Sequence, residues 1–190
     1  MPETYVKSSR VEQSEIEAKV VQAVAKALDI APDRVHLADS MQSDLGAESL
    51  DYLDIAFQLE RDFNVQFPRA DLLQRASEHF GEDALVKDGL VTDLGLKLLA
   101  RGMPELSAEI VKPGLRAADV ASALKVETFA RILNRLLVAK EAMPKDCPDC
   151  GGELAESATL PELVCGRCGK TVPMPSGDSV LLADLIEMSR

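Results

Sequence analysis

The chain has 190 residues, 46% of them hydrophobic, which is enough for a real core in one ordinary domain or two small ones. Its 32 acidic and 21 basic side chains give a formal net charge of −11, which disfavours nucleic acid and anionic membranes and favours basic partners. No apolar run approaches the ~18 residues needed to span a bilayer, and the N-terminus lacks a signal pattern. The sequence therefore predicts a globular, cytoplasmic protein with no membrane span.

The first helical pattern follows a polar lead-in of 13 residues. Apolar residues at three- and four-residue steps predict a helix from Glu15 to about Leu28, and Ser14 with Glu17 has the spacing of a capping box. Residues 29–43 contain Pro32 and lose this period. They predict a long loop pinned to the core by single apolar anchors, which are Ile30, Val35, Leu37 and Met41.

A polar turn from Asp44 to Asp51 opens the second helical pattern, which runs from Ser49 to about Asn64. The first N–H groups of a helix have no internal partner and form the positive end of its dipole, so a phosphate esterified to Ser49 would be stabilised there. A group attached to Ser49 would project away from the core. The periodic residues predict one buried face, made of Leu50, Leu53, Ala56, Phe57, Leu59 and Phe63.

The residues around this serine form a recognisable pattern. It consists of Asp44-Leu45-Gly46, Ser49-Leu50-Asp51 and the run Leu59-Glu60-Arg61-Asp62-Phe63 followed by Phe67-Pro68. The pattern resembles the phosphopantetheine attachment motif of the acyl carrier protein family, although that family usually has aspartate where this chain has Glu48. The resemblance implies a non-enzymatic carrier whose Ser49 receives 4′-phosphopantetheine from coenzyme A. It also implies that Asp44 and Glu48 help to position a phosphopantetheinyl transferase and its magnesium. A serine that merely caps the helix remains the alternative.

Six carboxylates and one base lie between Asp44 and Asp62. A solvated helix face is the ordinary explanation of such a run. The resemblance implies a second one, in which acidic residues of this helix dock basic patches of the acyl-loading, ketosynthase-type or other acyl-processing enzymes. On that reading the docking residues are Asp51, Asp54 and Glu60, and added salt should weaken the encounter.

Residues 69–115 add more sequence than a minimal carrier needs before its last helix. One helix is expected around Leu72, Leu73, Ala76 and Phe80, and a second around Leu90, Leu94 and Leu98. Gly95 disfavours the second helix by ~1 kcal/mol. The insertion is a lid, a docking surface or extra core, and packing on its own domain is the ordinary explanation. The resemblance adds a sharper hypothesis, in which the insertion extends the apolar cavity that shelters the acyl chain of a carrier protein or binds a dedicated partner.

The period returns after a turn at Lys112-Pro113-Gly114 and continues to about Ala142, which predicts the closing helix of the bundle, lengthened or split near Lys125. Pro144 then ends the helix. We therefore expect an acyl carrier domain over residues 1–143, with a helical insertion at about 69–115, followed by a separate module over residues 144–190.

All four cysteines lie in this last module, as two Cys-x-x-Cys pairs that are each followed by glycine: Cys147, Cys150, Cys165 and Cys168. Each pair aims two thiolates at one point, and two pairs complete a tetrahedral site. The pattern resembles a zinc ribbon with a hairpin from Glu153 to Val164, and the expected zinc is structural. Reduced cytosolic thiols disfavour disulfides, a redox pair would leave the second pair unexplained, and iron bound as in rubredoxins stays open.

The charge of the module argues against nucleic acid, because residues 146–190 carry eight acids and three bases. A protein partner fits better. The tail, with Val180, Leu181, Leu182, Leu185, Ile186 and Met188, predicts a short amphipathic helix that packs on the ribbon or presents an apolar face.

Together these patterns predict a mainly α protein: an acyl-carrier-type helical bundle with an enlarged middle segment, a small zinc ribbon and a short C-terminal helix. The expected function is to carry acyl thioesters on Ser49 in fatty acid, polyketide or related lipid or specialised biosynthesis. One rival is an unmodified, carrier-like interaction protein that docks through its ribbon. Another is a nucleic-acid-binding ribbon protein, which the charge disfavours.

Overall fold

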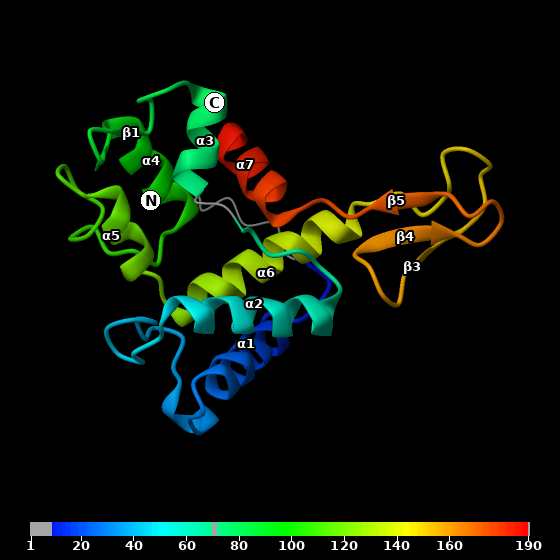
Figure 1. Ribbon diagram of the computed structural model, residues 1–190, viewed down its shortest axis with the longest axis horizontal. Coiled ribbons are helices and arrows are strands. Elements are labelled where there is room, and N and C mark those ends of the chain that lie inside the picture. Colours follow the sequence, from blue (N-terminus) through cyan, green and yellow to red (C-terminus); the bar gives the residue numbers. More distant parts are fainter. Residues whose placement is uncertain (1–8, 70–71, 190) are drawn as a thin grey trace.

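The computed structural model describes residues 9–69 and 72–189 and shows a helical body from which a small sheet projects as an arm (Figure 1). Among the described residues, no helix is both long and apolar enough to cross a membrane. The elements in chain order are α1 Gln13–Ala27, the 3₁₀ turn η1 Pro32–Arg34, α2 Ser49–Phe63, α3 Leu72–Phe80, β1 Val86–Lys87, β2 Leu90–Val91, α4 Asp93–Gly102, α5 Ala117–Ser122, α6 Val126–Glu141, β3 Leu154–Glu156, β4 Glu162–Cys165, β5 Thr171–Pro173 and α7 Gly177–Met188.

The main core lies among α1, α2 and α6, because α1 packs against both of the other helices. The two predicted helices and the pinned loop are present, although α1 begins two residues earlier than expected. Its N-cap is Glu12, so the capping box expected at Ser14 is wrong. The loop anchors Val35 and Met41 are buried as expected. Side chains with no exposed surface fill the centre of this core: Ile16, Val20, Val24, Met41, Ile55, Leu59, Val126 and Leu133.

The buried face of α2 differs from the prediction. Ala56 and Leu59 are buried as expected, but Leu50, Leu53 and Phe57 are 76%, 44% and 56% exposed. Ile55, which was not part of the predicted face, is fully buried. Residues at positions 50, 53 and 57 have helical spacing, but so do those at 55 and 59, and periodicity alone cannot decide which stripe faces the core. The position of α1 and α6 decides it, and an apolar stripe is left on the outer surface of α2.

The insertion consists of α3, the β1–β2 hairpin and α4. The predicted second helix begins later than expected, because Leu90 lies in β2 opposite Lys87. Thr92 caps α4 by accepting a hydrogen bond from the backbone N–H of Gly95 at 3.2 Å. A Cβ atom on Gly95 would lie 2.6 Å from the carbonyl oxygen of Leu85. Close packing of α4 on the hairpin therefore explains why Gly95 stands in this helix, although glycine lowers intrinsic helix propensity.

The closing segment is split near Lys125 as the sequence predicted, with α5 before the break and α6 after it. The long loop between α1 and α2 reaches this junction. Met41 donates its backbone N–H to the carbonyl of Leu124 at 2.9 Å, and Val126 donates to the carbonyl of Asp39 at 3.1 Å. These bonds place the junction between α5 and α6 beside the turn that precedes Ser49.

The arm is an antiparallel sheet in the order β3–β4–β5, with Leu154 opposite Cys165. The expected hairpin between the cysteine pairs is therefore present. The tail helix α7 differs from expectation, because it returns from the arm and packs against α3, α4 and α6 (Figure 1). Its apolar residues Leu181, Leu185 and Met188 are buried there. The insertion supplies the apolar surface that α7 covers, and the sequence alone gave no sign of this partner.

Candidate functional site

Ser49 is the first residue of α2 and its side chain is exposed. Glu48, in an extended conformation, is the N-cap residue, so Ser49 does not act as the cap. The cap is closed by the backbone N–H of Glu48, which donates to Oδ2 of Asp51 at 2.7 Å. Within the described part of the chain the Ser49 hydroxyl has no hydrogen-bond partner. It is a solvent-facing alcohol at the positive end of a helix, where an attached phosphate would be stabilised.

The acidic residues near Ser49 have different surroundings. Asp44 accepts a hydrogen bond from the backbone N–H of Ser40 at 2.8 Å, which closes the preceding turn. Asp54 is exposed, and Glu48 is exposed beside the serine. Glu60, the third residue expected to dock partners, is only 15% exposed and accepts hydrogen bonds from Arg69 Nη2 at 2.6 Å and from the backbone N–H of Phe67 at 2.7 Å. Its carboxylate is thus largely taken up by internal contacts.

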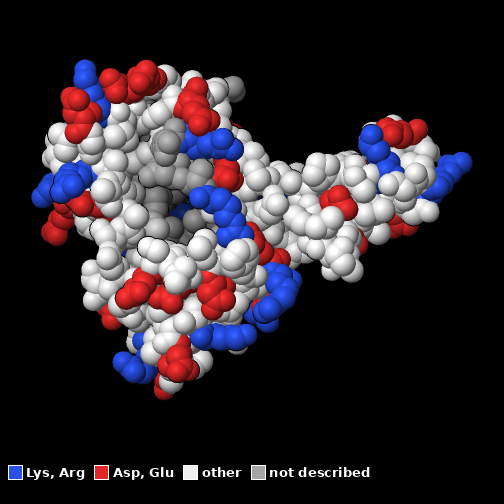
Figure 2. Space-filling model, viewed as in Figure 1, with Lys and Arg blue, Asp and Glu red and all other residues white. Residues whose placement is uncertain are grey.

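The outer surface of α2 also carries the apolar stripe of Leu50, Leu53 and Phe57, which sequence reasoning placed in the core. The guanidinium of Arg69 lies 4.4 Å from the ring centre of Phe57 and covers it in part. Figure 2, which has the orientation of Figure 1, shows acidic side chains over α2. The exposed face of this helix thus combines apolar and negatively charged groups, which suits a basic partner with an apolar contact. Ile55, an apolar residue that the predicted face leaves out, was the sequence signal for a different buried face.

A surface groove runs from Ser49 to α5. It is bounded on one side by Ala47, Glu48 and Leu50, and on the other by Ala118 and Ala121. The loop bonds that draw Leu124 towards Met41 hold the two sides together. A chain attached to Ser49 can therefore lie along α5 instead of extending freely into solvent.

Known proteins match the region around this serine. A family model described as a phosphopantetheine attachment site matches residues 18–77. The acyl carrier protein of Amoebophilus asiaticus is 40% identical over 55 residues, which is 29% of this chain and 69% of that protein. Those of Treponema denticola and Porphyromonas gingivalis are 40% and 36% identical over 50 and 55 residues, covering 64% and 70% of their own lengths. The chain belongs to the acyl carrier protein family.

The region matched by the family model contains most of α1, all of α2 and most of α3, and the remainder of the chain lies outside it. The relatives support a carrier role and the family model supports phosphopantetheine as the attached group. No solved structure matches the chain. The carrier region is therefore joined to a hairpin, a cysteine cluster and a tail helix that the family model does not cover.

The cysteine cluster brings all four predicted sulfur ligands together. Their Sγ atoms all lie within 4.8 Å of one another, with Cys147 to Cys168 at 3.6 Å and Cys150 to Cys165 at 3.5 Å. A tetrahedral site with Zn–S bonds of about 2.3 Å has sulfur–sulfur edges of about 3.8 Å. The four thiols are unlinked by disulfides. Their number, type and separation fit one tetrahedral, thiolate-binding ion such as zinc.

The thiols influence one another strongly. Backbone N–H groups of Cys168 and Arg167 donate to the sulfur of Cys165 and lower its pKa to about 6. At Cys150 the N–H of Gly152 also lowers the pKa, but the thiols of Cys168 and Cys165 outweigh it and raise the pKa to about 12. One thiolate forms readily and then opposes ionisation of its neighbours. A divalent cation would remove this opposition, and its binding would release protons.

The arm is fastened to the helical body at the end of α2 that lies away from Ser49. Oε2 of Glu156 in β3 accepts hydrogen bonds from Asn64 at 2.9 Å and from Lys140 at 2.8 Å. Burial alone would raise the pKa of Glu156, but the bonds from Lys140 and Asn64 lower it overall. Because α2 has 15 residues, it separates this anchor from Ser49 by about 22 Å. The cysteine cluster is thus remote from the serine.

Proposed function

We propose that this protein carries acyl intermediates as thioesters on a 4′-phosphopantetheine arm attached to Ser49. The observation that supports this most directly is the exposed hydroxyl at the first position of α2, within a region that matches the phosphopantetheine attachment family. In the loading step the Ser49 oxygen attacks the β-phosphorus of coenzyme A. The bond to adenosine 3′,5′-bisphosphate breaks, and the serine proton passes to a base on the transferase. The terminal thiol of the arm then forms the acyl thioester.

Glu48 and Asp44 are the proposed contacts for the transferase and its magnesium. Glu48 is exposed directly beside Ser49, whereas Asp44 also closes a turn, so substitution of Asp44 should affect both loading and local order. Asp51 and Asp54 are the proposed docking residues for basic patches on partner enzymes, together with the apolar stripe of α2. Glu60 contributes mainly by holding Arg69 against Phe57.

Residues 1–143 with the returning helix α7 form the proposed carrier body, and residues 144–175 form a zinc ribbon fastened to it. In this proposal the zinc is structural, because four cysteines fill its coordination sphere and leave no position for a substrate or water. The ribbon then presents a surface to a protein partner. The proposed pathways are fatty acid, polyketide or related biosynthesis in the cytoplasm.

Intact-mass measurement tests the proposal. Protein incubated with coenzyme A and a promiscuous phosphopantetheinyl transferase should gain the mass of one phosphopantetheinyl group. Ser49→Ala should gain none, and Ser43→Ala, which removes an exposed hydroxyl from the preceding turn, should be loaded like the wild type. If the wild type stayed unmodified while an ordinary acyl carrier protein was loaded in the same mixture, the rival of an unmodified, carrier-like scaffold would be favoured.

A further inference from the structure

A cavity of about 200 Å³ lies between the inserted segment and the closing helices α5 and α6. Most of its walls are apolar, with Leu99 and Met103 from the insertion, Val120 and Leu124 from the α5 segment and Leu181 from α7. The cavity therefore does not lie inside the α1–α2–α6 core. It exists only because the insertion and α7 are placed against the outer side of α6.

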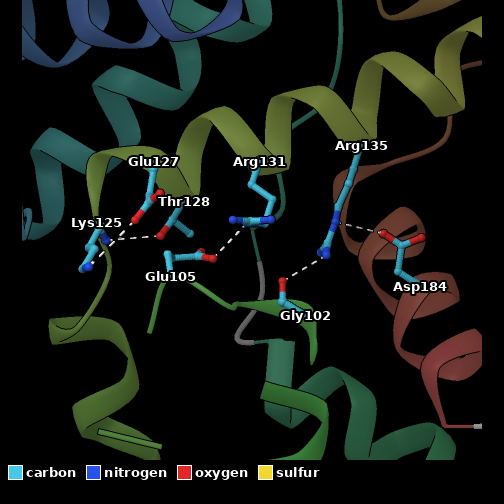
Figure 3. Close-up of polar contacts among 8 residues, drawn as sticks. All are labelled: Gly102, Glu105, Lys125, Glu127, Thr128, Arg131, Arg135 and Asp184. Atoms are coloured by element: carbon cyan, nitrogen blue, oxygen red, sulfur yellow. Dashed lines mark hydrogen bonds and ion pairs between the residues drawn. The ribbon is translucent and has the colours of Figure 1, made fainter. Parts of the chain in front are cut away.

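A buried pair of opposite charges lines this apolar cavity. Figure 3 shows Arg131 projecting from α6 towards Glu105, which follows α4. The Glu105 side chain is completely buried, and its Oε2 lies 2.8 Å from Nε of Arg131. The two groups attract each other, but their approach lacks hydrogen-bond geometry, and neither oxygen of Glu105 has a hydrogen-bond partner among the described residues. Such a carboxylate keeps unused acceptor capacity at considerable cost.

The neighbouring arginine has a different, structural arrangement. Arg135 donates from Nη2 to the carbonyl of Gly102 at 3.0 Å, and its Nε lies 3.4 Å from Asp184 on α7 (Figure 3). These contacts join α4, α6 and α7 at one end of the cavity. The positive charges of Arg131 and Arg135 are balanced by two negative charges, on Glu105 and Asp184. A charged ligand would disturb that balance, whereas an uncharged hydrogen-bonding ligand would not.

The cavity adjoins the groove at Ser49, because Ala121 and Leu124 line both. From the start of α6 at Val126 to Arg131 is five residues, or about 8 Å along the helix. A flexible arm attached to Ser49 thus has a short path along α5 to the buried pair.

We propose that the cavity shelters an acyl group carried on Ser49 and selects one with a hydroxyl on a chain of short to medium length; this inference rests on the proposed carrier function. The hydroxyl donates a hydrogen bond to Glu105 and accepts one from Arg131, so it fills the unused capacity of both. A plain hydrocarbon chain leaves the carboxylate unpaired. The volume holds about seven groups of the ~30 Å³ that a water molecule occupies in the liquid, which suits the carbons of an octanoyl chain that lie beyond its thioester carbonyl.

The test compares protein loaded on Ser49 with octanoyl, 3-hydroxyoctanoyl or 8-hydroxyoctanoyl phosphopantetheine, whose hydroxyls lie near to and far from the thioester. Intact mass first establishes that each arm is present. The rate of thioester cleavage by hydroxylamine then reports shelter. At least one hydroxyacyl arm should be cleaved about three- to tenfold more slowly than the octanoyl arm, which is the range expected for one net hydrogen bond.

Two variants show whether the cavity is responsible. Ala121→Phe should block the way from the groove into the cavity and speed cleavage of all three arms towards the rate of a free thioester. Ala38→Phe, at an exposed alanine outside the cavity and the groove, should leave the rates unchanged. Glu105→Leu, which removes the acceptor, should reduce the difference between hydroxyacyl and octanoyl arms. Because that comparison is made within one variant, a general loss of stability cancels. Equal rates in the wild type and Ala121→Phe, or no effect of the hydroxyl, would overturn the proposal.

Failure of loading would be a separate result, visible as the absence of a mass gain. The cavity can then be tested by itself with S-(3-hydroxyoctanoyl)-N-acetylcysteamine and S-(8-hydroxyoctanoyl)-N-acetylcysteamine added to Ser49→Ala protein. Binding that shifts the NMR signals of Val120 and Ile132, and that Ala121→Phe and Glu105→Leu weaken, would support the site without the tether. No binding of either probe would count against it.

Discussion

The helical body and the cysteine arm differ in what holds them together. In the body, α1, α2 and α6 bury a continuous apolar core in which Ile16, Leu59 and Leu133 have no exposed surface. The arm has strands of three or four residues, and two of its five core residues are the cysteines Cys147 and Cys165. Units of fewer than about 40 residues rarely fold on apolar burial alone. One chain thus combines a body stabilised by hydrophobic packing with an arm that, in our proposal, is stabilised by a bound ion.

Metal removal should have the largest effect and should affect the arm alone. Cys150→Ser or strong chelation should unfold residues 145–174, because structural zinc sites contribute roughly 10–16 kcal/mol of apparent binding free energy. Amide hydrogen exchange should show fast exchange in β3–β5 and unchanged protection in α1, α2 and α6. Protected β4 amides in protein shown to be free of metal would mean that the arm has another source of stability.

Shortening a core side chain should destabilise the helical body and leave the arm unaffected. Leu59→Ala should destabilise the body by about 2–5 kcal/mol, because Leu59 is fully buried and the change leaves a cavity. Leu53→Ala on the exposed stripe of the same helix is the matched control and should change stability by no more than about 0.5 kcal/mol. Urea unfolding followed by helical circular dichroism gives both values. The metal content should be the same in both variants, and a loss of metal from Leu59→Ala would couple the two regions more closely than we infer.

Gly95→Ala tests how tightly the insertion is packed. The added methyl would lie 2.6 Å from the carbonyl oxygen of Leu85 and 2.7 Å from Val91, so the hairpin must move. We expect a loss of about 1–3 kcal/mol, the usual effect of overpacking, despite the better helix propensity of alanine. Gly166→Ala meets no atom within 4 Å and should be nearly neutral. A stabilised Gly95→Ala protein, measured by thermal unfolding, would contradict this packing.

The smallest expected effect concerns the contact between the two regions. The pKa of Glu156 is lowered in the folded protein, so its contribution is present at pH values above its unfolded pKa and is lost as pH falls through the folded value. Because this carboxylate is half exposed, the contribution should be below about 1 kcal/mol. Glu156→Gln should reduce the dependence of stability on pH in the acidic range. Identical pH profiles for both proteins would show that Glu156 does not anchor the arm.

The sequence predicted the features whose signals are local. Helix positions follow from apolar periodicity, the break near Lys125 from a gap in that periodicity, and the clustering of the cysteines from their spacing. Ser49 was placed at a helix start because a polar turn precedes an apolar period.

Features that depend on the packing of distant segments were missed. Leu50, Leu53 and Phe57 have helical spacing whether they face the core or solvent, and only the position of α1 and α6 decides between these. The docking of α7 on the insertion and the approach of Glu105 to Arg131 join residues 26 or more positions apart. No periodicity in a single segment encodes such contacts, because they follow from how whole helices pack.

The central claim, that Ser49 bears the arm, is tested most directly by peptide mapping of protein purified from its native cells. Tandem mass spectrometry should locate one phosphopantetheinyl group on the peptide containing Ser49, with or without an acyl load. An unmodified Ser49 peptide in all of the protein, or the same group on another residue, would contradict the account.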